Sequence, residues 1–114
     1  MRESLVKIVE FLKSIKCKNI SAFDLSENGE EKYFIIASAL TTDDTKKAAD
    51  EVAEFIGYDK DKDGYYKGEW IILNAEPIII HIFTTAERAK YNLDRLYKSK
   101  EINVLKSSKS KKSK

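Results

Sequence analysis

Apolar residues in the first third of the chain follow a helical spacing and then two extended ones. Between residues 3 and 16 they recur at steps of one or three positions and fall on one face of a helix. Residues 19–26 and 32–39 read as strands, and Asn28-Gly29 between them favours a two-residue hairpin turn. The pattern therefore predicts a helix followed by a β-hairpin.

A second helix is predicted between residues 41 and 57. The sequence Thr-Thr-Asp-Asp at 41–44 offers N-cap hydroxyls and places acids in the first turn, where they favour a helix. Gly57 is the residue type that commonly ends a helix. The positions expected to be buried on this helix are Ala48, Ala49, Val52, Ala53 and Ile56.

A second hairpin is predicted over residues 68–83. Pro77 cannot donate to a strand ladder, so the turn is placed at residues 74–77, which sets Leu73 opposite Ile78 and Trp70 opposite His81. One face of the hairpin then carries Ile71, Leu73, Ile78, Ile80 and Ile82, and the other carries Trp70, Ile72, Ile79, His81 and Phe83. Because both faces are apolar, both must be covered, by helices or by a partner.

A third helix is expected to start near Thr85. Its inward residues are expected to be Ala89, Leu93, Leu96 and Tyr97, with Arg88, Tyr91 and Arg95 on its other side. The order helix, hairpin, helix, hairpin, helix predicts an α+β fold. It takes the form of an α/β sandwich, in which three helices pack on a mixed sheet of about four to five strands.

Charge is distributed unevenly along the 114 residues. Residues 106–114 hold five of the 21 basic residues and no acid, so the rest of the chain, with 16 basic and 19 acidic residues, carries −3. We expect one domain over residues 1–105 and a disordered lysine-rich tail over 106–114. Such a tail suits either solubility or weak contact with RNA phosphates.

The composition also limits location and chemistry. The longest apolar run is residues 78–80, too short to span a membrane, and the N-terminus lacks the core of a signal peptide, so a cytoplasmic protein is expected. Cys17 and His81 are the single residues of their types, which excludes an internal disulfide and a recognisable zinc set.

Residues 59–70 begin like a calcium-binding loop, with Asp59, Asp61 and Asp63 followed by Gly64. The twelfth position of such a loop needs a bidentate glutamate, and Trp70 stands there instead. Elsewhere no glycine-rich loop could cradle a phosphate, and helix capping accounts for the acids at 43–44. We therefore expect no metal, no cofactor and no catalysis.

The segment GEWIILNAEPIIIHIFTTAERAKYNLDRLYKS, residues 68–99, resembles the signature of the ribosomal silencing factor (RsfS, or Iojap) family. There a Trp opens a strand, a second strand ends in His-x-Phe, and Arg-x-x-Tyr-x-Leu-acid-x-Leu-aromatic follows. The matching positions are Trp70, His81, Phe83, Arg88, Tyr91, Leu93, Asp94, Leu96 and Tyr97. The resemblance covers roughly residues 5–102, and Asp63-Gly64 fits an acid-glycine pair that the family carries shortly before its Trp.

The resemblance implies a fold similar to nucleotidyltransferases without their active site. It also implies binding to the large ribosomal subunit at protein L-fourteen, where the bound protein obstructs the small subunit and lowers translation when nutrients run short. The residues expected to bind the partner are Trp70, Ile72, His81, Tyr91, Asp94 and Tyr97. The chain departs from the family pattern at Ala39, Asp44, Asn74, Glu76, Pro77 and Tyr97.

Two other functions stay open at this stage. One is a single-stranded RNA binder that uses Tyr65, Tyr66 and the lysine tail for stacking and phosphate contacts. The other is a vestigial nucleotidyltransferase-like enzyme, which would need magnesium and a nucleotide. An apolar sheet face would suit either a homodimer or a ribosomal partner.

Overall fold

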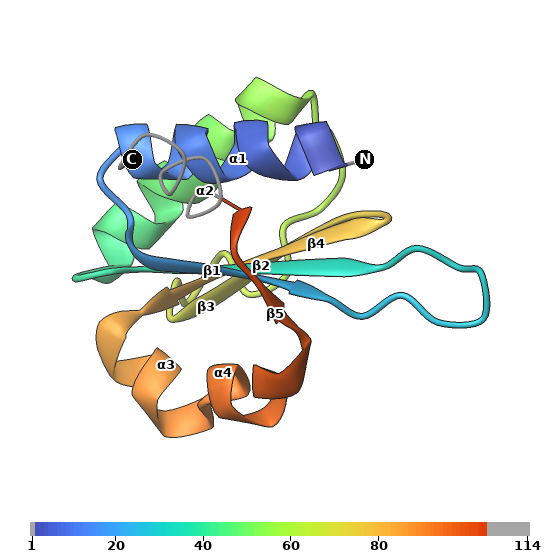
Figure 1. Ribbon diagram of the computed structural model, residues 1–114. Helices are drawn as coiled ribbons and strands as arrows, with labels where there is room; N and C mark the ends of the chain where they lie inside the picture. The colour runs from blue at the N-terminus through green and yellow to red at the C-terminus, as the bar shows by residue number, and fades with distance from the viewer. Residues whose placement is uncertain (1, 105–114) are drawn as a thin grey trace, which may run out of the picture.

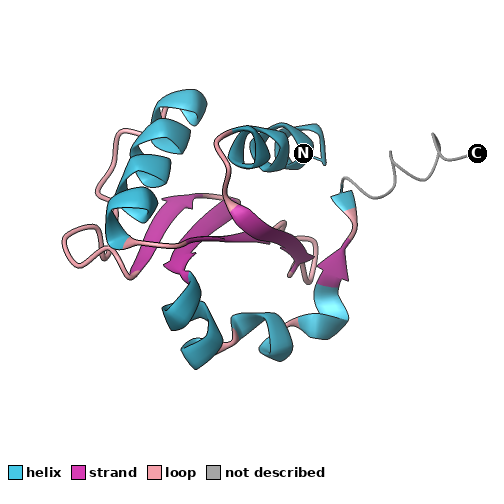
Figure 2. Cartoon of the chain, turned by 90° about the vertical axis from the view of Figure 1, so that its left-hand side faces the viewer, coloured by secondary structure: helices cyan, strands magenta, loops and turns pink. Residues whose placement is uncertain are grey.

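A mixed five-stranded sheet lies between two layers of helices in the computed structural model of the chain (Figures 1 and 2). The structure describes residues 2–104. The elements follow in the order α1 (Arg2–Ser14), β1 (Lys18–Asp24), β2 (Tyr33–Ala39), α2 (Thr42–Ile56), β3 (Trp70–Ala75), β4 (Ile78–Thr84), α3 (Thr85–Tyr91), α4 (Leu93–Leu96), the 3₁₀ helix η1 (Lys98–Lys100) and β5 (Glu101–Ile102). The tail at 106–114 lies outside the described residues, so its disorder stays a prediction. No helix in the described part is long and apolar enough to cross a membrane.

The strands lie in the order β3-β4-β2-β1-β5. β2 and β4 run parallel, with Ile35 beside Ile80, and the other neighbours are antiparallel. Because a parallel pair needs a crossover rather than a tight turn, the chain passes between these two strands through α2 and β3. Figure 1 shows α1 and α2 over one face of the sheet and α3 and α4 over the other. The expected α+β fold with a mixed sheet is confirmed.

Local sequence signals set the first turn and the ends of α2 where they were predicted. Asn28 and Gly29 both adopt positive φ, at 54° and 81°, as a two-residue hairpin turn with the twist of its strands requires. The Thr41 side chain accepts a hydrogen bond from the Asp44 amide at 3.2 Å, and Gly57 ends the helix at φ 71°. Backbone requirements and residue type agree at each of these positions.

The larger core lies between the sheet and the helices α1 and α2. The side chains of Leu5, Leu12 and Val52 from the helices are fully buried against Ile35 and Ile80 of the central strands. Full burial of such a side chain contributes about 1.5–3 kcal/mol relative to exposure. The predicted buried face of α2 is confirmed except at Ile56, which is partly exposed.

The second hairpin is tighter than predicted. Ala75 pairs with Ile78, so the turn is reduced to Glu76-Pro77, and Trp70 lies opposite Phe83 while Ile72 lies opposite His81. The predicted register was therefore wrong. It assumed that the ladder stopped before residue 74, whereas β3 continues through Ala75 and the Pro77 carbonyl accepts from the Tyr33 amide at 2.8 Å. The two faces are nevertheless as predicted, because a register change of two residues preserves the alternation of side chains.

The predicted single third helix is broken in two. Asn92 adopts φ 51°, ending α3 and changing the direction of the chain before α4. Leu93 and Tyr97 pack on the sheet as expected, but Leu96 is 68% exposed and Ala89 is exposed as well. The helical period used for the prediction does not continue through the left-handed Asn92, and Leu96 beyond it leaves the inward face. Ala89 lies before this break, where Arg88 takes the inward position instead.

Arg88 also departs from the prediction, since it turns towards the sheet. Its Nη1 donates to the hydroxyl of Ser38 at 3.2 Å, and its Nε and Nη2 donate to the two carboxylate oxygens of Asp94 at 3.0 and 2.7 Å. A planar guanidinium matches a carboxylate in this two-point manner. The pair ties α3, α4 and the central strand β2 together.

The acidic loop of residues 58–69 folds along the edge of β3. Asp63 exchanges two backbone hydrogen bonds with Ile72, at 3.0 and 2.9 Å, and Gly64 follows at φ 77°. A Cβ added at Gly64 would lie 2.1 Å from the carbonyl oxygen of Trp70. The loop thus occupies backbone groups of an edge strand and holds the chain tightly against the first residue of β3.

Replacing Gly64 by Ala is expected to destabilise the fold more than replacing Gly29 by Ala. Both glycines have positive φ, which costs a side chain about 1–2 kcal/mol, but only at Gly64 does a neighbouring backbone atom also occupy the space of the new methyl. We expect Gly64→Ala to lower the free energy of unfolding by about 3 kcal/mol or more. Urea denaturation of both variants measures the difference, and equal losses would contradict the close approach.

Candidate docking surface

Three aromatic side chains from different elements meet at the start of β3. The Trp70 ring stacks on Phe83 of β4, with centroids 4.8 Å apart, and lies 4.9 Å from the ring of Tyr91 on α3. Phe83 is fully buried, Trp70 is partly exposed, and Tyr91 is 50% exposed. Solvent exposure in the cluster therefore increases from Phe83 through Trp70 to Tyr91, and the indole and phenol rings present surface to solvent.

His81 lies beneath this surface and holds Trp70 in place. The indole Nε1–H of Trp70 donates to Nδ1 of His81 at 3.1 Å, and the imidazole is only 5% exposed. Since Nδ1 accepts, the proton of the neutral ring sits on Nε2, which has no hydrogen-bond partner among the described residues. Burial lowers the pKa of His81 to about 4, so the ring is neutral at physiological pH.

The remaining predicted partner-binding residues occupy different depths of the same sheet face. Ile72 is half-buried and lies opposite His81 in the ladder of β3 and β4. Tyr97 is half-buried too, and its ring meets Phe34 edge-on at a centroid distance of 5.3 Å. Asp94 is paired with Arg88, and 32% of its side chain is exposed.

The structure therefore divides the six predicted residues by accessibility. Tyr91 is exposed and His81 is buried, while the other four are half-buried: Trp70, Ile72, Asp94 and Tyr97. Leu96 was expected to face inward, but it adds exposed apolar area on α4. The signal that could have revealed it is Asn92, a residue type that readily adopts the left-handed conformation and so ends helices.

Neither a metal-ligand cluster nor a reactive thiol is found among the described residues. Within residues 2–104 no three His, Cys, Asp or Glu side chains converge to hold a metal ion. Cys17 is buried, and desolvation together with the charge of Glu51 raises the pKa of its thiol to about 11, which keeps it protonated and unreactive. Tryptophan and tyrosine are enriched among the residues that supply most of the binding energy of protein interfaces, which makes this surface a candidate for docking.

Stability should fall on acidification because His81 is held neutral. Folding lowers the pKa of His81 from 6.5 to about 4. The part of the free energy of unfolding that depends on a neutral imidazole is therefore fully present above pH 6.5 and is lost as pH falls towards 4. The difference corresponds to about 3 kcal/mol. Urea denaturation between pH 7.5 and pH 4 should show a steeper loss in the wild type than in His81→Phe, which cannot titrate. Parallel curves for the two proteins would refute this assignment.

The sequence is similar to a known protein family and to two curated relatives. The family described as "Ribosomal silencing factor during starvation" (RsfS) matches residues 1–114. The ribosomal silencing factor RsfS of Zymomonas mobilis is 35% identical over 69 residues, which cover 57% of this chain and 52% of that protein. The RsfS of Halalkalibacterium halodurans is 33% identical over 70 residues, covering 61% and 53% respectively. The matched region thus spans about half the length of these curated relatives.

Solved structures show the same fold. A protein from Chromobacterium violaceum superposes with a TM-score of 0.73 at 25% identity, covering 85% of this chain and 86% of that one. A Bacillus halodurans protein gives 0.70 at 21% identity, covering 89% and 98%. With the family match over the whole sequence, and with the signature residues Trp70, His81 and Tyr91 brought together in space, the chain belongs to the RsfS family of ribosomal silencing factors.

Proposed function

We propose that this chain silences translation by binding the large ribosomal subunit at protein L-fourteen and blocking the approach of the small subunit. The observation that carries the proposal is the partly exposed apolar surface of Trp70, Tyr91 and Ile72, two aromatic residues and one aliphatic, in a chain of the RsfS family. Large aromatic side chains that become buried at the centre of an interface supply much of its binding energy.

The hydrogen bond between Trp70 and His81 supports this role physically. An indole that is already fixed by a 3.1 Å hydrogen bond and by stacking on Phe83 loses little further conformational freedom when a partner covers it. A buried neutral imidazole contributes no charge that a partner would have to desolvate. The free energy gained by covering the indole face is therefore offset by only a small entropy cost of ordering the side chain.

Charge and size are suited to a steric mechanism. The domain outside the lysine tail carries −3, which favours a basic ribosomal protein surface and disfavours nonspecific adhesion to RNA. The folded chain measures 41 × 34 × 29 Å, and a rigid body of this size bound at a subunit-joining face excludes a second subunit by volume alone. Such a block needs affinity and position, with no catalytic step, in the cytoplasm where ribosomes work.

An RNA-binding function has less support from the described residues. Tyr65 is engaged, since its hydroxyl donates to Asp50 at 2.9 Å and Lys46 and Lys62 lie near its ring. Only Tyr66 of the predicted pair, at 93% exposure, is open for stacking on a base. The same residue therefore serves as a matched control for the docking surface.

Trp70→Ala should weaken binding to purified large subunits by at least about tenfold, because it removes the central anchor. Tyr66→Ala, an exposed aromatic on the loop, should change affinity by less than about twofold. Co-sedimentation with separated subunits at physiological salt measures both, and a subunit-joining assay should show that Trp70→Ala no longer inhibits. Tyr91→Ala provides a second test with an exposed residue.

Thermal unfolding of each variant establishes that it is folded. Unchanged large-subunit affinity in folded Trp70→Ala and Tyr91→Ala would remove this surface from the interface. Equal loss in Tyr66→Ala, or loss only when residues 106–114 are deleted, would instead indicate an RNA contact.

A further inference from the structure

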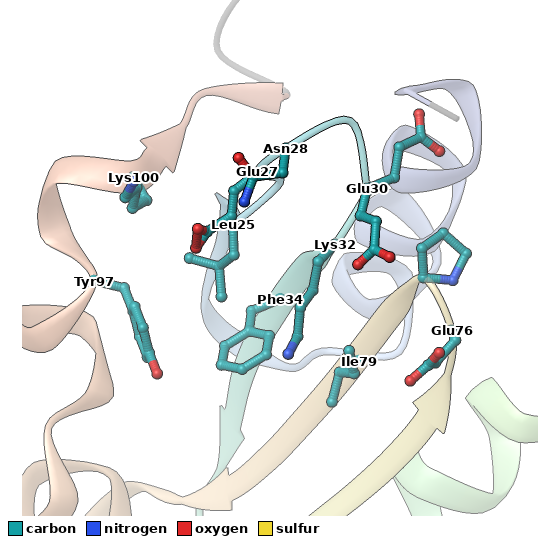
Figure 3. A pocket seen from close by; sticks show the side chains of 12 residues that line it. Leu25, Glu27, Asn28, Glu30, Lys32, Phe34, Glu76, Ile79, Tyr97 and Lys100 are labelled. Atoms are coloured by element: carbon teal, nitrogen blue, oxygen red, sulfur yellow. The ribbon is translucent and has the colours of Figure 1, made fainter.

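A groove apart from Trp70 and Tyr91 lies where the β1–β2 hairpin meets the start of β4 (Figure 3). Its volume is about 780 Å³, and Leu25, Phe34, Ile79 and Tyr97 supply its apolar lining. Leu25, Phe34 and Tyr97 are half-buried, so their surfaces remain open to a partner. In Figure 3, Tyr97 forms one wall and Phe34 and Ile79 lie across from it on the strands.

The rim of this groove is acidic and its carboxylates are unpaired. Glu27, Glu30 and Glu31 come from the hairpin and Glu76 from the turn between β3 and β4. Across the described part of the chain, none of the four forms an ion pair. They also do not converge on one point, since no three acids within residues 2–104 could hold a metal ion. Separated negative charges around an apolar floor suit several cations spaced along a chain.

From this arrangement we infer that the groove binds an extended basic peptide segment of a partner protein, with lysine or arginine alternating with apolar residues. The cationic ends reach the rim carboxylates, and the side-chain stems and apolar residues cover Phe34 and Tyr97. Four carboxylates against Lys32 and Lys100 leave the lining net negative, which repels the phosphates of RNA. Self-association through this face would bring like charges together. The groove shares Tyr97 with the predicted partner-binding residues, but neither Trp70 nor Tyr91 lines it, so substitutions at Glu30 and Glu76 test the groove separately from the proposed docking to protein L-fourteen.

Turn geometry and hydrogen bonds fix the conformation of the hairpin that lines the groove. Its tip is fixed by the left-handed pair Asn28-Gly29, and the Lys32 amide donates to the Ser26 hydroxyl at 3.1 Å. The Leu25 amide donates to the Lys32 carbonyl at 2.8 Å, which closes the hairpin below its tip. A segment tied in this way presents its glutamates without having to be ordered by the partner.

The test uses the full chain and a fluorescently labelled nonapeptide that alternates lysine with valine, followed by fluorescence anisotropy at low salt. The double variant Glu30→Lys and Glu76→Lys should bind at least about tenfold more weakly than the wild type. The control, Glu10→Lys and Glu54→Lys, makes the same change in net charge at exposed positions on α1 and α2. These helices cover the sheet face opposite to the one where Phe34 and Tyr97 line the groove (Figure 1). The control should change affinity by less than about threefold, the residual effect of the altered overall charge.

Two further peptides distinguish the contribution of apolar contact from that of positive charge. A peptide with serine in place of valine, similar in composition to residues 106–114 of this chain, should bind at least about fivefold more weakly, because it leaves the apolar floor uncovered. A peptide with glutamate in place of lysine should not bind. Equal losses in the groove and control variants, equal affinity for the serine peptide, or no binding by the wild type would each overturn the inference.

Discussion

Burial of β4 along its whole length is the constraint on which the rest of the molecule depends. All seven of its residues are buried, with β2 on one side, β3 on the other, and apolar side chains directed to both faces. A strand of this kind cannot leave either face in water, so each face requires its own helical layer. The crossover helix α2, together with α1, covers one face, and the chain that follows β4 covers the other.

The second layer is the thinner one, and the candidate docking surface lies at its margin. α3 and α4 together contain eleven residues, and neither has a buried residue of its own; contacts such as that of Arg88 with Asp94 and Ser38 secure them to the sheet. Because this cover is narrow, Trp70 and Ile72 at the edge strand β3 are only partly buried. Incomplete cover of an apolar face thus leaves the indole of Trp70 partly open to solvent, while its hydrogen bond to His81 keeps that side chain in one orientation.

Sequence patterns predicted those features that depend on single residues or on alternation. The Asn28-Gly29 turn, the cap at Thr41, the end at Gly57 and the two faces of the second hairpin each rest on backbone chemistry that a few residues determine. The features that the sequence did not predict depend on tertiary contacts. The register of β3 depended on how far the ladder continued towards Pro77, and the orientation of Arg88 on the position of Asp94 after the break at Asn92.

The residues of the candidate site were easier to predict from the sequence than the burial of each one. Recognising Trp70, His81 and Tyr91 as one group needed only their spacing within the family signature, and the structure brings their elements together. That His81 lies under the indole, and that Asp94 is already paired, could not be read from periodicity, because both depend on hydrogen bonds across elements. The groove under the hairpin carries no sequence signal beyond a run of acids.

Trp70 is the single tryptophan of the chain, and its environment gives the protein an intrinsic optical reporter. Indole emission responds to solvent contact and to hydrogen bonding at Nε1, and here that nitrogen is bound to His81 while the ring is half open to water. Selective excitation of tryptophan therefore observes this one surface against an otherwise silent molecule. A partner that covers the indole would shift the emission of the unmodified protein, so encounters with ribosomal components could be timed in solution without attaching a dye.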